Sequence, residues 1–311
     1  MVLVHDLSPD WRKGRVLRAS DVAALEQFPE IHVVELEPGD VHEDEAGRRL
    51  AESLAAVGLL RIEGPAQSQY RLVAERRGLL RVRPDVLARL NAMPAVAIFT
   101  LYDGQAVEAG EEVAGCKITP VAVTESVVSE VAYLAQELRV IQLLPFQRLA
   151  TSVVVTEKLK PRARDLFRQA VERKLGWYGA EMLGVSEIAR SDRAVRAAYA
   201  EAAARGADLI LFAGASSIDP LDPAYTELSR AGGELVRFGM PVHPGSMLWT
   251  GRLGPATVLG IASCAGFGRN TALDLVLPFV FGGAPLDLAE LGYGGLIETA
   301  AGRRFPSYPA D

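Results

Sequence analysis

Small and acidic residues follow one apolar stretch of the chain, and these residue types could bind a polar ligand. The run 209–213 is apolar and predicts a fully buried strand. The residues that follow it include Gly214, Ala215, Ser216, Ser217, Asp219 and Asp222. Small side chains let backbone amides approach an anion, hydroxyls add donors, and a carboxylate can hold a metal or orient a hydroxyl group. The alternative is an ordinary strand-to-loop turn, with Asp222 as the N-cap of a helix that begins near Ala224.

Two further loops could complete such a site. The apolar runs 151–156 and 257–261 also predict strands, and the first closes with Thr156 and Glu157. The second leads into a loop of small residues that includes Ser263, Cys264 and Gly266. A helix that we predict to be capped by Asn270 follows this loop. Its N-terminus would present unpaired amides and a positive dipole end to an anion.

The elements that must position these loops alternate between strand and helix. Helices are predicted at 162–175, from a cap at Ser191 to Arg205, and at 224–231, and a further strand at 182–188. This alternation predicts a mainly parallel sheet with helices on both faces, which is a three-layer α/β fold. Ligands of such sheets bind beyond the carboxyl ends of the strands. The three loops that follow residues 155, 213 and 261 therefore predict one shared site.

The chain up to about residue 148 predicts a separate α+β module that is rich in short strands. Residues 43–57 predict a helix with an acidic first turn, because apolar residues recur at helical spacing at Ala46, Leu50, Leu54 and Val57. The other predicted elements are a strand and a short helix capped by Ser20 or Asp21, a strand entering a turn at Pro38-Gly39, and strands at 79–83, 96–101 and 107–118. Residues 141–148 predict a connector. We thus predict a module at 1–148, an α/β domain at 149–285 and a C-terminal tail at 286–311.

Composition excludes several classes of protein. The 311 residues carry a net charge of -6, which argues against a general nucleic-acid binder. Cys116 and Cys264 have no disulfide or zinc spacing and predict buried small side chains in a reducing cytosol. Cys264 is near no obvious base and His243 near no acidic partner in sequence, so neither predicts nucleophilic or general-base catalysis. No signal peptide is expected, and the apolar run 275–286 is too short to span a bilayer, so we expect a soluble cytoplasmic protein.

Residues 151–283 resemble the molybdopterin-binding domain of molybdenum-cofactor biosynthesis proteins, of the molybdopterin adenylyltransferase and molybdenum-insertion type. The family pattern is an ADLVLTTGGTG-like strand and loop, an Asp a few positions on, a proline-glycine element and a second glycine-bearing loop. The corresponding residues here are Ala207-Asp208, the run 213–217, Asp222, Pro244-Gly245 and the run 260–266. The segments KGRVLRASDVAAL and IHVVELEPGDV are similar to the head region of the same proteins.

The order of both parts, with RFGMPVHPGSMLWTG and NTALDLVLPFVFGG, is most similar to the molybdopterin-binding half of bacterial fusions with a nucleotidyltransferase domain. That second domain is not in the sequence, so its activity is expected to be absent. The resemblance implies that the chain binds molybdopterin or the molybdenum cofactor, in its biosynthesis or handling. A small-molecule pterin is then the expected partner, together with a second copy of the chain, a molybdoenzyme or another cofactor-biosynthesis protein.

The resemblance also implies which residues form the site. Asp222 would be the catalytic residue and the ligand of a Mg²⁺ ion, and the pterin would be bound by Thr156, Gly214, Ala215, Ser216, Ser217, Asp219, Pro244, Gly245, Ser263, Cys264 and Gly266. Ala and Ser stand at several positions where the family commonly has Gly or Thr, which favours binding over catalysis. A Mg-dependent adenylyltransferase or molybdotransferase remains the first alternative. A nucleotide-binding oxidoreductase is the second, disfavoured because no GxGxxG follows the strand TSVVVT.

Overall fold

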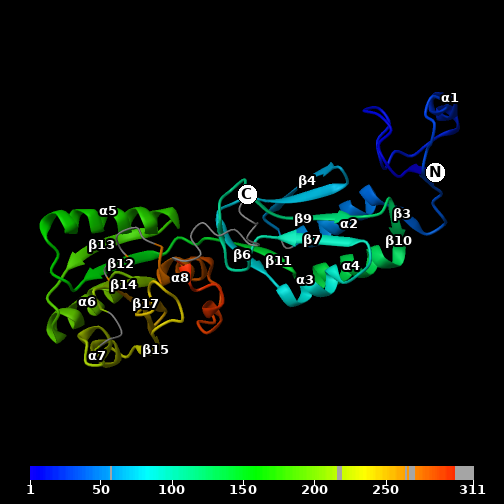
Figure 1. Ribbon diagram of the computed structural model, residues 1–311. Coiled ribbons are helices and arrows are strands. Elements are labelled where there is room, and N and C mark those ends of the chain that lie inside the picture. Colours follow the sequence, from blue (N-terminus) through cyan, green and yellow to red (C-terminus); the bar gives the residue numbers. More distant parts are fainter. Residues whose placement is uncertain (57, 216–218, 263–264, 266–269, 298–311) are drawn as a thin grey trace. The chain divides into compact units, whose positions relative to one another are not determined.

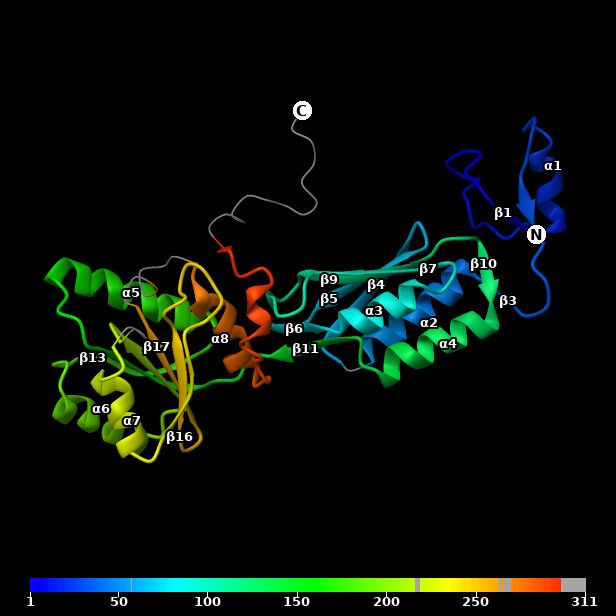
Figure 2. The same ribbon diagram turned by 60° about the horizontal axis from the view of Figure 1, so that its bottom comes forward.

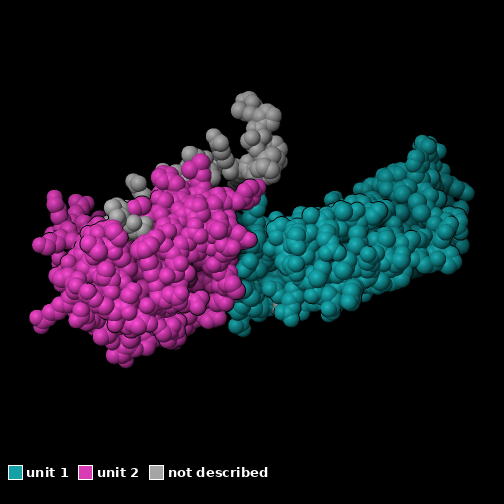
Figure 3. Space-filling view, turned by 90° about the horizontal axis from the view of Figure 1, so that it is seen from below, with its two compact units in different colours: residues 1–145 teal, residues 146–311 magenta. Residues whose placement is uncertain are grey.

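The computed structural model describes residues 1–56, 58–215, 219–262, 265 and 270–297 (Figure 1). Contacts divide the chain into two compact units, Met1–Pro145 (unit 1) and Phe146–Asp311 (unit 2), which are coloured separately in Figure 3. This division falls close to the boundary predicted at residue 148. The start of the predicted tail packs within unit 2, where the amide of His243 donates to the carbonyl of Gly295 at 2.7 Å.

Unit 2 is built on one six-stranded sheet in the order β13-β12-β14-β17-β16-β15. The first four strands run parallel, and the last two are added antiparallel. The bounds are β12 (Ala150–Val155), β13 (Glu181–Glu187), β14 (Leu209–Ala213), β15 (Glu234–Phe238), β16 (Trp249–Leu253) and β17 (Ala256–Ile261). The predicted mainly parallel α/β fold is confirmed, whereas β15 and β16 were not predicted.

Helices cover both faces of this sheet, which explains why β14 is buried along its whole length. The helices are α5 (Pro161–Trp177), α6 (Asp192–Ala204), α7 (Pro223–Arg230) and α8 (Ala272–Gly282). Ile210 and Phe212 of β14 pack in one core with α6 and α7. Figure 2 shows α5 on the opposite side of the sheet from α6 and α7. Helix α8 is tied to α5 by an ion pair, in which Lys174 Nζ lies 2.6 Å from Asp274 Oδ1.

The predicted cap of the last helix was wrong by one residue. Thr271, rather than Asn270, is the N-cap of α8, and its Oγ1 accepts from the amide of Leu273 at 3.3 Å. The carboxylate of Asp274 accepts in return from the amide of Thr271 at 2.8 Å, which completes a capping box. Ser191 does precede α6 as predicted, but among the described residues its hydroxyl caps no amide of that helix.

Unit 1 holds the predicted β-rich α+β module. Its four-stranded antiparallel sheet has the order β4-β5-β9-β7, and three smaller sheets have the orders β11-β6-β8, β10-β3 and β1-β2. The strands are β1 (Val2–Leu3), β2 (Val33–Val34), β3 (Asp40–His42), β4 (Leu60–Ala66), β5 (Gln69–Ala74), β6 (Gly78–Val82), β7 (Val96–Thr100), β8 (Ala106–Val107), β9 (Glu112–Ile118), β10 (Ala122–Thr124) and β11 (Ile141–Pro145). The helices are α1 (Val22–Leu25), α2 (Glu43–Ala55), α3 (Pro84–Asn91) and α4 (Glu125–Glu137).

Several local predictions for unit 1 were wrong. The predicted connector begins with β11, which pairs with β6. The predicted strand 107–118 is two strands separated by a turn, and α3 and α4 were not predicted. Neither Ser20 nor Asp21 caps α1 with its side chain; the carboxylate of Asp21 instead accepts from the amide of Arg18 at 2.8 Å. The helix predicted at 43–57 is confirmed as α2.

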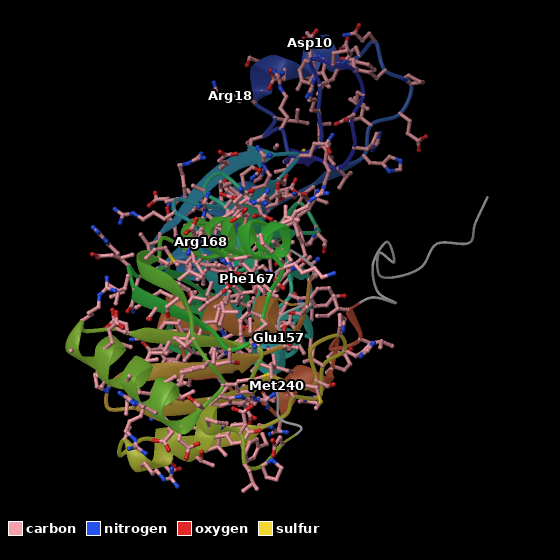
Figure 4. The ribbon with its side chains drawn as sticks, turned by 90° about the vertical axis from the view of Figure 1, so that its left-hand side faces the viewer. Asp10, Arg18, Glu157, Phe167, Arg168 and Met240 are labelled. Carbon is pink, nitrogen blue, oxygen red and sulfur yellow. The ribbon has the colours of Figure 1, made fainter. Side chains whose placement is uncertain are left out.

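A cavity of about 630 Å³ lies in the N-terminal segment of unit 1, where Figure 4 labels Arg18. Its lining is mostly apolar and comprises Met1, Leu17, Arg18, Ala19, Val22, Leu25, Glu26, Phe28, Ile31 and Val33. None of these residues belongs to the predicted pterin site. Within the described residues, no helix is both long enough and apolar enough to cross a membrane.

Cys116 is fully buried in β9, as predicted, and this burial raises the pKa of its thiol to about 12. The thiolate is the form that reacts with alkylating reagents. We therefore expect iodoacetamide at about pH 8 to leave Cys116 unmodified in the native protein and to alkylate it in urea-unfolded protein. Peptide mass spectrometry that separates Cys116 from Cys264 measures both rates. Equal rates in the native and unfolded states would contradict this expectation.

Candidate functional site

The loops that follow β12, β14 and β17 meet at one edge of the unit 2 sheet. The last residues of the three strands, Val155, Ala213 and Ile261, are paired side by side. Beyond them the amide of Thr156 donates to the carbonyl of Ala213, and the amide of Gly214 to that of Ile261, both at 2.9 Å. The predicted meeting of three loops at the carboxyl ends of the strands is thus confirmed. Ligand binding there stays a prediction.

Gly214 makes the close approach predicted for it, but the approach is to its own chain. Its φ of +90° lies in the left-handed region, and a Cβ there would be 2.7 Å from Cγ of Glu157 and 3.1 Å from the amide nitrogen of Glu157. The hydroxyl of Thr156 is also engaged internally, donating to the carbonyl of Ala213 at 3.2 Å. The carboxylate of Glu157, labelled in Figure 4, is exposed to solvent. The first residues of these two loops are therefore held against each other by contacts within the chain.

Trp249 fixes the next residue of the loop. Ala215 is fully buried, and its carbonyl accepts a hydrogen bond from Nε1 of Trp249 at 2.9 Å. Trp249 is itself fully buried in β16, where it is paired with Gly260 of β17. Sequence reasoning missed Trp249 because β16 was not predicted. The available signal was Gly260, which stands between the bulky Leu259 and Ile261 in the predicted strand.

Asp222 is the N-cap of α7, as the alternative interpretation predicted. Its side chain is fully buried; Oδ1 accepts from the amide of Ala224 at 2.7 Å, and Oδ2 accepts from Nη2 of Arg190. Both carboxylate oxygens are therefore engaged. Among the described residues, no group of three or more His, Cys, Asp or Glu side chains could hold a metal ion. The prediction that Asp222 binds Mg²⁺ gains no support from this geometry.

Asp219 lies on the surface beside this cap. Its Oδ1 accepts from the amide of Leu221 at 2.9 Å, and its carbonyl accepts from the hydroxyl of Tyr225. Burial, followed by the charges of Asp222 and Asp219, raises the pKa of Tyr225 to about 12. The phenol therefore stays protonated at neutral pH and keeps donating to this loop. Asp219 helps to shape the loop, whatever it contributes to a ligand.

Pro244 and Gly245 pack against the N-terminus of α8. The carbonyl of Pro244 accepts from the amide of Ala272 at 2.9 Å, and a Cβ at Gly245 would lie 2.6 Å from that amide nitrogen. The φ of Gly245 is +112°, so glycine fits both the conformation and the space. The structure thus brings together the proline-glycine element and the helix that follows the second loop. The predicted residues Ser216, Ser217, Ser263, Cys264 and Gly266 lie outside the described residues.

Arg190 is a second residue that sequence reasoning missed. It lies in the loop after β13. The first residue of this loop, Ile188, donates its amide to the carbonyl of Val155 at 2.9 Å, which places the loop beside the end of β12. Its side chain is 45% exposed, while that of its partner Asp222 is 0% exposed. No spacing rule connects the two positions in sequence, because they lie on different loops. The charge of this pair that faces solvent is therefore the guanidinium.

No protein-family model matches the chain, and no curated protein matches its sequence. The molybdopterin biosynthesis enzyme MoaB from Thermus thermophilus is 17% identical, covers 45% of this chain and 99% of its own, and has a TM-score of 0.34. A putative molybdenum cofactor biosynthesis protein from Corynebacterium diphtheriae is 16% identical, covers 45% of this chain and 100% of its own, and has a TM-score of 0.30. The molybdopterin biosynthesis MoeA protein from Pyrococcus horikoshii is 15% identical, covers 86% of this chain and 80% of its own, and has a TM-score of 0.32. Similarity at this level says nothing about substrate or activity.

Proposed function

We propose that this protein binds molybdopterin, or the molybdenum cofactor built on it, at the carboxyl edge of the β12, β14 and β17 strands. The observation that carries the proposal is that segments far apart in sequence, which resemble the molybdopterin-binding pattern, meet in unit 2. The loop after Ala213 lies beside the ends of β12 and β17. Pro244-Gly245 lies against the start of α8, the helix that the second loop leads into.

The two hydrogen bonds that Asp222 accepts favour a role in binding over a role in catalysis. A magnesium ion needs carboxylate oxygens that can face it. Here one oxygen of Asp222 caps α7 and the other is paired with Arg190. A Mg-dependent adenylyltransferase would have to break this pair to use Asp222. Formation of adenylated molybdopterin from ATP and Mg²⁺ would reinstate the enzyme alternative, whereas binding without turnover supports a carrier in the cytoplasm that hands the pterin to a partner protein.

Isothermal titration with molybdopterin under anaerobic conditions tests the proposal. We expect the wild-type protein to bind with the same affinity with and without Mg²⁺. Asp222→Asn should weaken binding about tenfold in both conditions, because it loosens Arg190 and one charge-assisted hydrogen bond is worth roughly this factor. Asp208→Asn is the matched control, since Asp208 precedes β14 at the opposite end of the strand and its carboxylate accepts from the amide of Ala150 at 2.8 Å.

Two results would count against the proposal. The absence of measurable binding by the wild-type protein would remove it. An equal loss of affinity in Asp208→Asn and Asp222→Asn would mean that the carboxyl edge of the sheet is not the binding edge.

A further inference from the structure

We propose that Arg190 recognises the phosphate end of the bound pterin, and that it does so without a metal ion. This inference rests on the proposed function and assigns the charged end of that same ligand. A guanidinium would then supply the positive charge at the site for which the resemblance implied a Mg²⁺ ion on Asp222. Asp222 then acts as a positioning residue, which holds the guanidinium in place.

The exposure of the two partners decides which of them can meet a ligand. Asp222 is fully buried, and each of its oxygens already accepts a hydrogen bond. The side chain of Arg190 is 45% exposed. An anion that approaches this pair from solvent therefore meets the cation.

Most of the N–H groups of Arg190 make no hydrogen bond among the described residues. A guanidinium carries five N–H groups, and the bond to Asp222 uses one of them, on Nη2. Within the described residues, Arg190 makes no other hydrogen bond from its side chain. The remaining N–H groups lie in the planar, forked geometry that matches two oxygens of a phosphate. The bond to the buried carboxylate restricts the orientation of this fork, which lowers the entropy lost when a ligand binds.

The charges on the neighbouring loop also favour an anion. Lys158 and Lys160 in the loop after β12 and Arg162 at the start of α5 are exposed, and none of them has a hydrogen-bond or ion-pair partner from its side chain in the described part of the chain. Arg164, in the first turn of α5, pairs with Glu187. The acidic groups that oppose them are Glu157 and Asp219, both exposed. The loop after β12 therefore carries two lysines against one glutamate, and Arg162 adds a further positive charge at the start of α5.

The structural alternative is that Arg190 serves only to neutralise the buried Asp222. The two roles differ in what the pterin phosphate contributes to binding. A neutralising residue affects the stability of α7 but does not distinguish a phosphorylated ligand from a dephosphorylated one. Discrimination between the two ligands is therefore the property to measure.

The experiment is a fluorescence titration, in EDTA, with oxidised fluorescent molybdopterin that retains its phosphate and with the same compound after phosphatase treatment. We expect the wild-type protein to prefer the phosphorylated form at least about tenfold, as one bidentate arginine–phosphate contact implies. Arg190→Gln should abolish this preference and leave the affinity for the dephosphorylated form within about twofold. Arg190→Lys should retain part of it, because the charge stays and the fork is lost.

Arg193→Gln is the matched control, because Arg193 is an exposed arginine in the first turn of α6 and makes no ion pair among the described residues. It should leave the preference unchanged. A preference that survives in Arg190→Gln, or one that appears only when Mg²⁺ is added, overturns the inference while the proposed function stands. If neither form of the pterin binds to the wild-type protein, the proposed function itself fails.

Arg190→Gln could unfold α7, which circular dichroism would detect. In that case competition on the wild-type protein decides the question. Inorganic pyrophosphate in EDTA should displace the phosphorylated pterin and leave the dephosphorylated pterin bound. Displacement of neither form, or of both equally, overturns the inference.

Discussion

Gly260→Ala is expected to lower the free energy of unfolding of unit 2 by about 2–5 kcal/mol, from overpacking together with the loss of a buried hydrogen bond. A Cβ at this position of β17 would overlap Nε1 and Cε2 of Trp249 and lie 2.6 Å from its Cδ1. The indole cannot move aside at low cost, because it is fully buried and packs edge-on against Tyr225. Its displacement would also break the hydrogen bond to the carbonyl of Ala215.

Urea unfolding followed by tryptophan fluorescence measures this loss. Gly176→Ala in α5 is the matched control, because a Cβ there meets nothing within 4 Å and alanine favours a helix. Trp249→Phe should partly restore the stability of Gly260→Ala, since the smaller ring leaves room for the methyl group. If Gly260→Ala stays within about 0.5 kcal/mol of the wild-type protein, the packing described for Trp249 is wrong.

The second large effect is expected for Gly214→Ala, at about 2–3 kcal/mol of destabilisation. The alanine would have to adopt a φ of +90° and place its Cβ 2.7 Å from Cγ of Glu157. Relief of either problem moves the loop after β14 away from Thr156. We therefore expect weaker pterin binding in the same variant, measured by the titration described above.

Gly206→Ala separates backbone strain from collision. Gly206 has a φ of +70°, which is also left-handed, but a Cβ there meets nothing within 4 Å. It should cost only about 1 kcal/mol, the usual penalty for a non-glycine residue in this conformation. A loss in Gly206→Ala as large as that in Gly214→Ala would show that the contact between Gly214 and Glu157 contributes nothing.

Much of unit 2 could be predicted because its signals are local. Strands covered on both faces are continuous apolar runs, and the helices between them carry apolar stripes at helical spacing. The two antiparallel strands lack such a signal: the edge strand β15 alternates between exposed and half-buried residues, and β16 contains Gly251 and Arg252. Helix α4 was open to prediction, because Val128, Val131 and Ala135 recur at helical spacing and are buried.

The sequence by itself determined the alternation of the four parallel strands and their helices in unit 2, and placed the small and acidic residues at the carboxyl ends of parallel strands. Only the tertiary structure decided what those residues do. Gly214 lies against Glu157, Trp249 holds Ala215, and Asp222 is bound to Arg190. Apolar periodicity and capping act within a few residues, so they can be read along the chain. Steric contacts and ion pairs join residues that meet only when the sheet and its helices have packed, so the ion pair between Asp222 and Arg190 became visible only in the folded protein.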